Sequence, residues 1–167
     1  MKTLRTRAAS LASAAAMALV LATASAAAPT DQYQTFNRID TTITDANTGL
    51  VWQREVVFKA PNQLAAIDYC RNVYKQNPPS TPWRLPTMKE LLTIVDETPH
   101  YEFEGIVNQA KMIDVNAFPH SPTDAEYWTS SIVANSSAAD GWVVKFRTGE
   151  NGPQGVNLPG YVRCVTP

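Results

Sequence analysis

The sequence predicts an α+β domain in which two amphipathic helices precede a small antiparallel sheet. Apolar residues recur at helical spacing in two segments of the first half of the chain. The last third instead alternates apolar and polar residues, and Asn, Ser, Gly and Pro separate its alternating segments. Helices followed by a run of strands are typical of the α+β class.

The first 26 residues have the pattern of a cleaved signal peptide. Three basic residues lie within the first seven, an apolar run follows at about 11–21, and small residues occupy 24–26. The apolar run is shorter than the ~20 residues that span a bilayer. We therefore expect residues 1–26 to be removed, leaving a secreted or periplasmic protein without a membrane anchor.

The rest of the chain is long enough for one domain. Residues 27–37 are polar and are predicted to form a flexible leader, followed by a single domain at 38–167. The signal peptide holds three of the 14 basic residues and none of the 15 acidic ones, so acidic side chains exceed basic ones by four in the mature chain. Nucleic acids and anionic membranes bind cationic surfaces, and we expect neither as a partner.

A β-hairpin is predicted at 38–52. Ile39, Thr41 and Ile43 alternate with polar residues, the turn residues at 45–49 follow, and Leu50 to Trp52 form the return strand.

The first helix is predicted at 62–74, between Pro61 and the Asn-Pro-Pro run at 77–79. Its apolar face consists of Ala66, Ile67, Cys70, Val73 and Tyr74. Cys70 is therefore expected to point into the core.

The second helix begins after Pro86 with a capping box. Thr87 and Glu90 have the T-x-x-E spacing in which each side chain accepts a hydrogen bond from the other residue's backbone N–H. Behind them, an apolar stripe at i, i+3, i+4 and i+7 predicts a helix that buries one face: Met88, Leu91, Leu92 and Val95.

The second half is predicted to be a long loop followed by three strands. The segment 99–124 lacks periodicity, and long loops of this kind are often functional. Strands are predicted at 127–133, 141–148 and 160–165. In the last two, alternation places Lys145, Arg147, Tyr161 and Arg163 on outward faces, and it places Trp142, Val144, Phe146, Val162 and Cys164 on inward faces.

The two cysteines, Cys70 and Cys164, lie in a chain that is expected to reach an oxidising compartment, which favours a disulfide. The alternative is a reactive or zinc-binding thiol pair. That alternative has neither a CxxC spacing nor neighbouring His ligands to support it.

Six sequence blocks follow one another in the order found in a known family. They are DANTGLVWQ at 45–53, IDYC at 67–70, WRLPT with ELL at 83–92, YWTSS at 127–131, GWVVKF at 141–146 and YVRCV at 161–165. Together they resemble the Lcl C-terminal domain family, which takes its name from a Legionella collagen-like adhesin. The resemblance covers about residues 38–166.

This resemblance implies a compact α+β fold related to C-type-lectin-like domains, with Cys70 and Cys164 at the positions of the family's disulfide. It also implies export. In the collagen-like adhesin the domain binds sulfated polysaccharides such as glycosaminoglycans, and for most relatives the ligand is unknown.

A cationic patch is one candidate ligand site. If the strands that begin at Gly141 and Gly160 are neighbours, Lys145, Arg147 and Arg163 cluster and can bind a sulfate, carboxylate or phosphate group. The alternative is that these cations are simply solvated.

Exposed aromatic rings are a second candidate, since they can stack on sugars. Tyr127 and Tyr161 are the preferred rings, because the four tryptophans lie in motifs typical of a core: Trp52, Trp83, Trp128 and Trp142.

No metal, cofactor or catalytic residue is predicted. The histidines and acidic residues between 96 and 120 lack the ligand spacing of calcium or zinc sites. Ser130 and Ser131 lie in neither a G-x-S-x-G nor an S-x-x-K motif.

The sequence therefore predicts a non-enzymatic binding module, with polysaccharide or acidic glycan as the favoured ligand. The alternative is a structural or protein-interaction subunit of a cell-envelope assembly. Neither the ligand nor the oligomeric state follows from the sequence.

Overall fold

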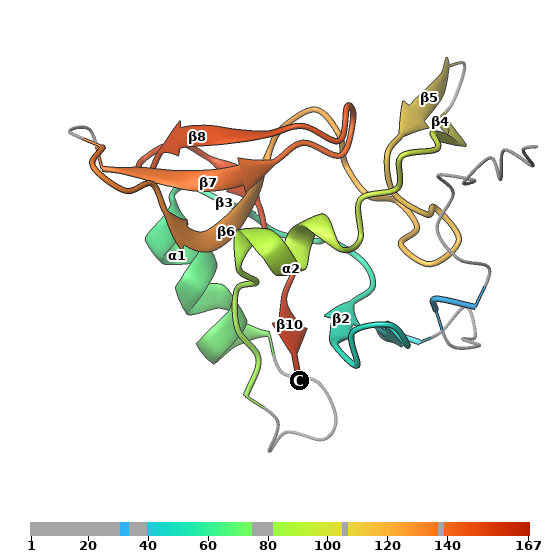
Figure 1. The fold of residues 1–167 in the computed structure, drawn as a ribbon, viewed down its shortest axis with the longest axis horizontal. Helices are drawn as coiled ribbons and strands as arrows, with labels where there is room; N and C mark the ends of the chain where they lie inside the picture. Colours follow the sequence, from blue (N-terminus) through green and yellow to red (C-terminus); the bar gives the residue numbers. More distant parts are fainter. Residues whose placement is uncertain (1–30, 34–39, 75–81, 105–106, 137–138) are drawn as a thin grey trace, which may run out of the picture.

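The structure is a computed structural model that describes residues 31–33, 40–74, 82–104, 107–136 and 139–167. The predicted signal peptide at 1–26 lies outside these ranges. Within them, no helix combines the length and apolar character needed to cross a membrane. The described chain is α+β, as predicted, with three sheets, short helices and one disulfide (Figure 1).

The predicted N-terminal hairpin is confirmed over its described residues, while Arg38 and Ile39 of the predicted first strand lie outside the described ranges. Strands β1 (Thr42–Thr44) and β2 (Val51–Gln53) pair antiparallel, and β10 (Val165–Thr166) adds to the other side of β2. The Asp45 carboxylate closes the turn by accepting hydrogen bonds from the Asn47 N–H at 2.9 Å and the Thr48 hydroxyl at 2.8 Å. Gly49 has a φ of 74°, a conformation that glycine adopts without steric cost.

The largest sheet has five strands in the order β3-β9-β6-β7-β8. These strands are β3 (Lys59–Ala60), β6 (Tyr127–Ile132), β7 (Asp140–Val144), β8 (Asn151–Gly155) and β9 (Gly160–Tyr161). All pairs are antiparallel except β6 with β9, which is parallel. The edge strand β8 was not predicted, because its sequence NGPQG consists largely of turn-forming residues.

Helix α1 (Gln63–Asp68) starts where predicted and continues into a π-helical segment, η1 (Tyr69–Val73). The Asn62 side chain caps α1 by accepting the Ala65 N–H at 2.8 Å. Cys70 is buried, as predicted. Val73 was predicted on the same apolar face but is 63% exposed, because the wider π turn rotates the last residues away from the α-helical period.

Helix α2 (Met88–Leu92) has the predicted capping box. The Thr87 hydroxyl accepts the Glu90 N–H, and the Glu90 carboxylate accepts the Thr87 N–H at 2.8 Å. Arg84 then donates two hydrogen bonds to the same carboxylate, at 2.8 and 2.7 Å. These contacts hold the pKa of Glu90 at about 2, with the Arg84 hydrogen bonds as the main cause.

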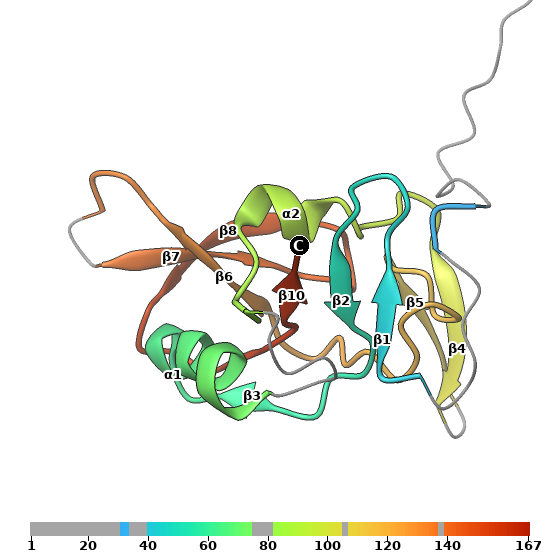
Figure 2. The same cartoon turned by 90° about the horizontal axis from the view of Figure 1, so that it is seen from below.

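Alternate residues of the five-stranded sheet enter two cores on opposite faces. On one face, Tyr127 and Val144 pack with Leu91 of α2. On the other face, Trp128 and Val143 pack with Ala66 of α1. The sheet is therefore a central layer, with α1 and α2 on opposite sides (Figures 1 and 2).

The segment 99–124 is not a plain loop, and this prediction is wrong in its first part. Strands β4 (His100–Glu104) and β5 (Val107–Lys111) form an antiparallel hairpin at the end of the molecule opposite the β6–β7 turn (Figure 2). His100 contacts the buried Asp96 carboxylate at 2.6 Å, which ties the base of the hairpin to the chain that follows α2.

Part of the predicted leader packs on the domain. Gln32 is buried, its carbonyl accepts the Ala46 N–H at 2.7 Å, and its side chain donates to the Thr93 carbonyl at 3.2 Å. The Tyr33 ring meets the Phe118 ring edge-on, with centroids 5.1 Å apart. Residues 27–30 and 34–37 lie outside the described ranges.

The predicted disulfide is confirmed. Cys70 in η1 bonds to Cys164 between β9 and β10, with 94 positions between them and a Cα–Cα distance of 5.4 Å. Both residues are fully buried. The bond joins the core beneath α1 to the C-terminal segment.

Replacing both cysteines by serine is expected to lower the free energy of unfolding by about 2–5 kcal/mol, because the unfolded chain regains the freedom that the closed loop removes. Urea denaturation of the oxidised protein and of the double variant measures the difference. A reductant should shift the wild-type midpoint and leave the double variant unchanged. Equal midpoints for the two oxidised proteins would contradict the assignment.

Glu90→Gln is expected to destabilise the protein at pH 7 by about 1 kcal/mol, a typical value for a capping contact with a partly exposed ion pair. The folded pKa of Glu90 is about 2, below the ordinary value of 4.5. The ionised Glu90 carboxylate therefore stabilises the folded state above pH 4.5, and this contribution declines as the pH falls towards 2. Thermal unfolding across this range should show wild type and variant converging; a gap that persists at pH 2 would refute it.

Candidate functional site

The predicted cationic patch does not form, because its residues are separated in the sheet. Strand β6 lies between β7 and β9, so the strands that begin near Gly141 and Gly160 are not neighbours. Lys145 and Arg147 lie in the turn after β7, where Lys145 is partly exposed and Arg147 is exposed. The third member, Arg163, is 0% exposed.

Arg163 was predicted to face solvent, and this prediction is wrong. Its Nη1 donates to the carbonyls of Gln53 and Arg54, at 2.6 and 2.7 Å, and its Nη2 donates to the Ser121 hydroxyl at 2.7 Å. The guanidinium also lies 4.5 Å from the centre of the Phe118 ring. The predicted strand at 160–165 is in fact two short strands, β9 and β10, and Arg163 lies in the buried segment between them, where alternation does not apply.

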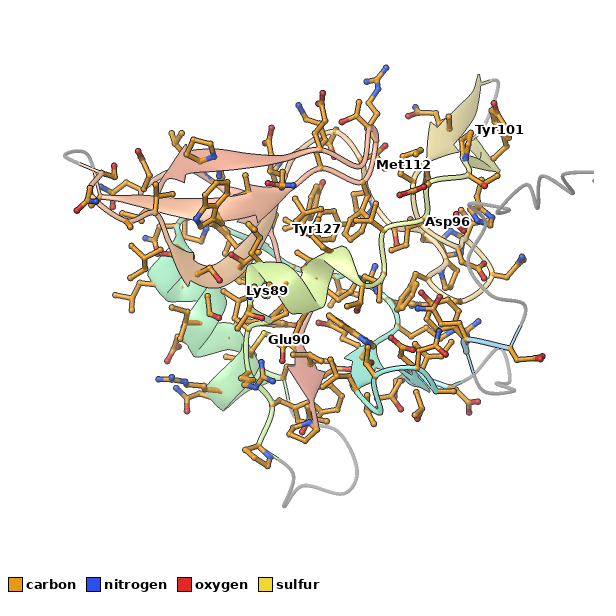
Figure 3. The ribbon with its side chains drawn as sticks, in the orientation of Figure 1. Lys89, Glu90, Asp96, Tyr101, Met112 and Tyr127 are labelled. Atoms are coloured by element: carbon orange, nitrogen blue, oxygen red, sulfur yellow. A yellow bond between two sulfur atoms is a disulfide. The ribbon has the colours of Figure 1, made fainter. Side chains whose placement is uncertain are left out.

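The two candidate tyrosines have different environments. Tyr127 is fully buried, and Figure 3 shows it in the middle of the molecule, so its prediction as an exposed stacking ring is wrong. Tyr161 is partly exposed, but the Lys59 ammonium lies 4.8 Å from its ring centre, and its hydroxyl donates to the Asp124 carboxylate at 2.8 Å. This hydrogen bond is the main reason that the pKa of Asp124 is lowered. One face of Tyr161 is therefore already covered.

Three of the four tryptophans are core residues, as predicted: Trp52, Trp83 and Trp128. Trp142 is only half-buried. Its strand β7 pairs at this position with Pro153 of the edge strand β8.

A concave surface with a largely polar lining lies over β7 and β8, on the sheet face that also carries α1. It has a volume of about 430 Å³, within the usual range of small-molecule sites. Its polar lining consists of Glu126, Lys145, Glu150, Asn151 and Gln154. We call it the β7–β8 groove.

The polar side chains of the groove are held in place by short local contacts. The Lys145 ammonium lies 3.4 Å from the Glu126 carboxylate, with both side chains about one-third exposed. The Thr148 hydroxyl donates to Glu150 at 2.9 Å, and the Gln154 amide donates to the Pro159 carbonyl at 3.3 Å. The groove therefore offers fixed donors and acceptors to a ligand.

Apolar groups complete the groove. Leu158 is 53% exposed, and Pro153 and the backbone of Gly152 continue the surface along β8. A Cβ atom added at Gly152 would meet no other atom within 4 Å. A side chain introduced at this position would therefore extend into open space without disturbing the core.

Lys145 is the one candidate of the sequence analysis that lies in this groove. The β8 residues Asn151 and Gln154 were missed, because Gly152, Pro153 and Gly155 hide the strand alternation. The turn signal Thr148-Gly149 was visible in the sequence, and Gly149 indeed has a φ of 74°. A return strand predicted after that turn would have included Asn151 and Gln154.

A second cavity of about 420 Å³ is lined by Arg71, Pro82, Trp83, Arg84 and Pro167. Most of its lining is apolar, and Arg84 is already bound to Glu90.

The described residues contain no group of three or more His, Cys, Asp and Glu side chains that could hold a metal ion. The two serines weighed as nucleophiles make structural contacts. The Ser130 hydroxyl donates to the Pro86 carbonyl at 3.2 Å, and the Ser131 hydroxyl accepts the Met88 N–H at 3.0 Å. Both therefore position the chain before and at the start of α2.

Comparison with known proteins gives one result. A family model described as the Lcl C-terminal domain matches residues 41–166 of this chain. No curated protein and no solved structure matches it.

Arg163→Met is expected to lower the free energy of unfolding by at least about 3 kcal/mol, because several buried acceptors lose their donor and each costs about 1–3 kcal/mol. Arg147→Met, which removes the same charge from an exposed turn, should change it by less than about 0.5 kcal/mol. Urea denaturation monitored by tryptophan fluorescence compares the two. Equal effects would show that the burial of Arg163 has been misassigned.

Proposed function

This chain belongs to the Lcl C-terminal domain family, and from that premise we propose that it is an exported, non-enzymatic module that binds polysaccharide. The family match covers nearly all of the described domain. We further infer that its α+β fold is related to C-type-lectin-like domains. The features of residues 1–26 support export to the periplasm or the outside of the cell.

The observation that carries this proposal is the β7–β8 groove. Sugars are recognised by planar polar groups that pair with hydroxyls, together with apolar surface for the C–H faces. The groove supplies two carboxylates, the Gln154 amide and an ammonium beside Leu158. It is shallow and lies on the surface, as suits a polymer that must pass across the protein.

A binding role without catalysis is supported by the same side chains. Hydrolysis of a glycosidic bond generally needs a pair of carboxyl groups with one acting as the proton donor. In the groove, the Glu126 carboxylate lies 3.4 Å from the Lys145 ammonium and the Glu150 carboxylate accepts the Thr148 hydroxyl at 2.9 Å, so both carboxylates are already engaged by neighbouring side chains.

The alternative, a structural or protein-interaction subunit, has weaker support at this surface. The Lys145 backbone N–H donates to the Glu150 carbonyl, and the Lys145 carbonyl accepts the Gly149 N–H. Residue pairs with and without backbone hydrogen bonds alternate along an antiparallel ladder, so this contact determines which β7–β8 pairs are hydrogen-bonded. By this alternation, Pro153 and Trp142 form a pair without backbone hydrogen bonds between β8 and β7. The backbone N and C=O of Pro153 therefore point to the open edge of the sheet. Proline has no N–H to donate there, which discourages a partner strand.

A glycan array tests the proposal with the full chain expressed and exported, then purified in its mature form. Concentration-dependent binding to at least one polysaccharide is expected. Gly152→Phe should abolish that binding, because the ring fills the groove.

Ala134→Phe is the matched control, since it adds the same ring to an exposed turn that does not line the groove. It should bind like wild type. Absence of binding to every polysaccharide, together with a stable co-purifying protein, would favour the alternative function. Equal binding by wild type and Gly152→Phe would show that the binding site lies outside the β7–β8 groove.

A further inference from the structure

The charges that line the β7–β8 groove indicate which kind of sugar it accepts. One ammonium, on Lys145, lies beside two carboxylates, on Glu126 and Glu150. The formal charge of the groove is therefore negative by one unit. From this balance we propose that the groove binds an uncharged stretch of polysaccharide and disfavours sulfated or carboxylated sugar. This inference rests on the proposed function and specifies its ligand.

Lys145 is not available as a free anion receptor. Its Nζ atom lies 3.4 Å from Glu126 Oε1, and the two side chains are exposed to similar extents. A sulfate that approached Lys145 would have to displace the Glu126 carboxylate or lie close to its negative charge. Like charges at such distances repel strongly when a ligand excludes water from between them.

Neighbouring cations do not reverse this balance. Lys59 is paired with Asp124 at 3.5 Å, and Arg163 is buried. Arg147 is exposed on the same turn as Lys145, but it does not line the groove. The predicted anion-binding trio thus contributes one ammonium to the groove, and a carboxylate already neutralises it.

Uncharged sugar matches the remaining groups. Hydroxyls both donate and accept hydrogen bonds, so they can pair with the Glu150 carboxylate, with the Gln154 amide and with Lys145. The exposed Leu158 offers apolar surface for the C–H face of a sugar ring. The charged pair at the groove then serves as a hydrogen-bonding group without net charge.

The test compares matched polymers. Immobilised dextran, mannan and galactan are each paired with their chemically sulfated derivatives, and heparin and alginate are added. For every backbone that the mature wild-type protein binds, the uncharged polymer should bind at least tenfold more tightly than its sulfated derivative. Gly152→Phe should lose this binding, while Ala134→Phe should retain it.

A charge-inverting variant provides the second arm. Glu126→Gln with Glu150→Gln changes the formal charge of the groove from −1 to +1, and it should raise affinity for sulfated polymers at least tenfold in a salt-sensitive manner. Glu55→Gln with Glu97→Gln makes the same change at exposed carboxylates outside the groove and should give no such gain.

The outcomes distinguish a wrong ligand preference from a wrong polysaccharide-binding function. Tighter binding of wild type to sulfated polymers than to their uncharged parents would overturn this inference and leave the polysaccharide-binding function standing. Equal gains by both glutamine double variants would overturn it as well, since the effect would not depend on the groove. Failure to bind any polysaccharide would overturn the proposed function and this inference together.

Discussion

The fold depends on the burial of one guanidinium. Arg163 is removed from water, so its donors must find acceptors inside the protein, and two of them are backbone carbonyls at the end of β2. A third acceptor, Ser121, belongs to the segment before β6, whose Phe118 ring also lies against the guanidinium. One side chain thus fixes three segments that are distant in sequence, and the rings of the core fill in around it.

The position of the groove follows from how little of the sheet α1 covers. The helix packs on β3 and β6, and at Gly141 of β7 a Cβ atom would collide with the Gln63 amide. That amide donates to the Thr129 carbonyl at 2.8 Å, which holds the helix against β6. Farther from the helix on the same face, the polar side chains that line the groove are exposed at least in part.

Local signals in the sequence were sufficient where one rule determined the structure. The Thr87 and Glu90 capping box and the 45–49 turn formed as predicted. Alternation failed in the C-terminal segment, because residues 162–164 form no strand and are all buried, and Arg163 was therefore wrongly placed in solvent. The site was missed for a related reason: β8 consists of residues that usually end strands, and only its pairing with β7 makes it one.

The contacts of the C-terminal segment also bear on how fast the chain folds. Arg163 and Cys164 reach Gln53 and Arg54 across separations of 109 to 111 residues. Closing so long a loop is entropically costly before any contact compensates for it, and folds rich in such contacts form slowly. Until β10 docks, one edge of β2 is unpaired. The hazard for this protein therefore lies in the interval before its last strand docks, when another chain can occupy that edge first.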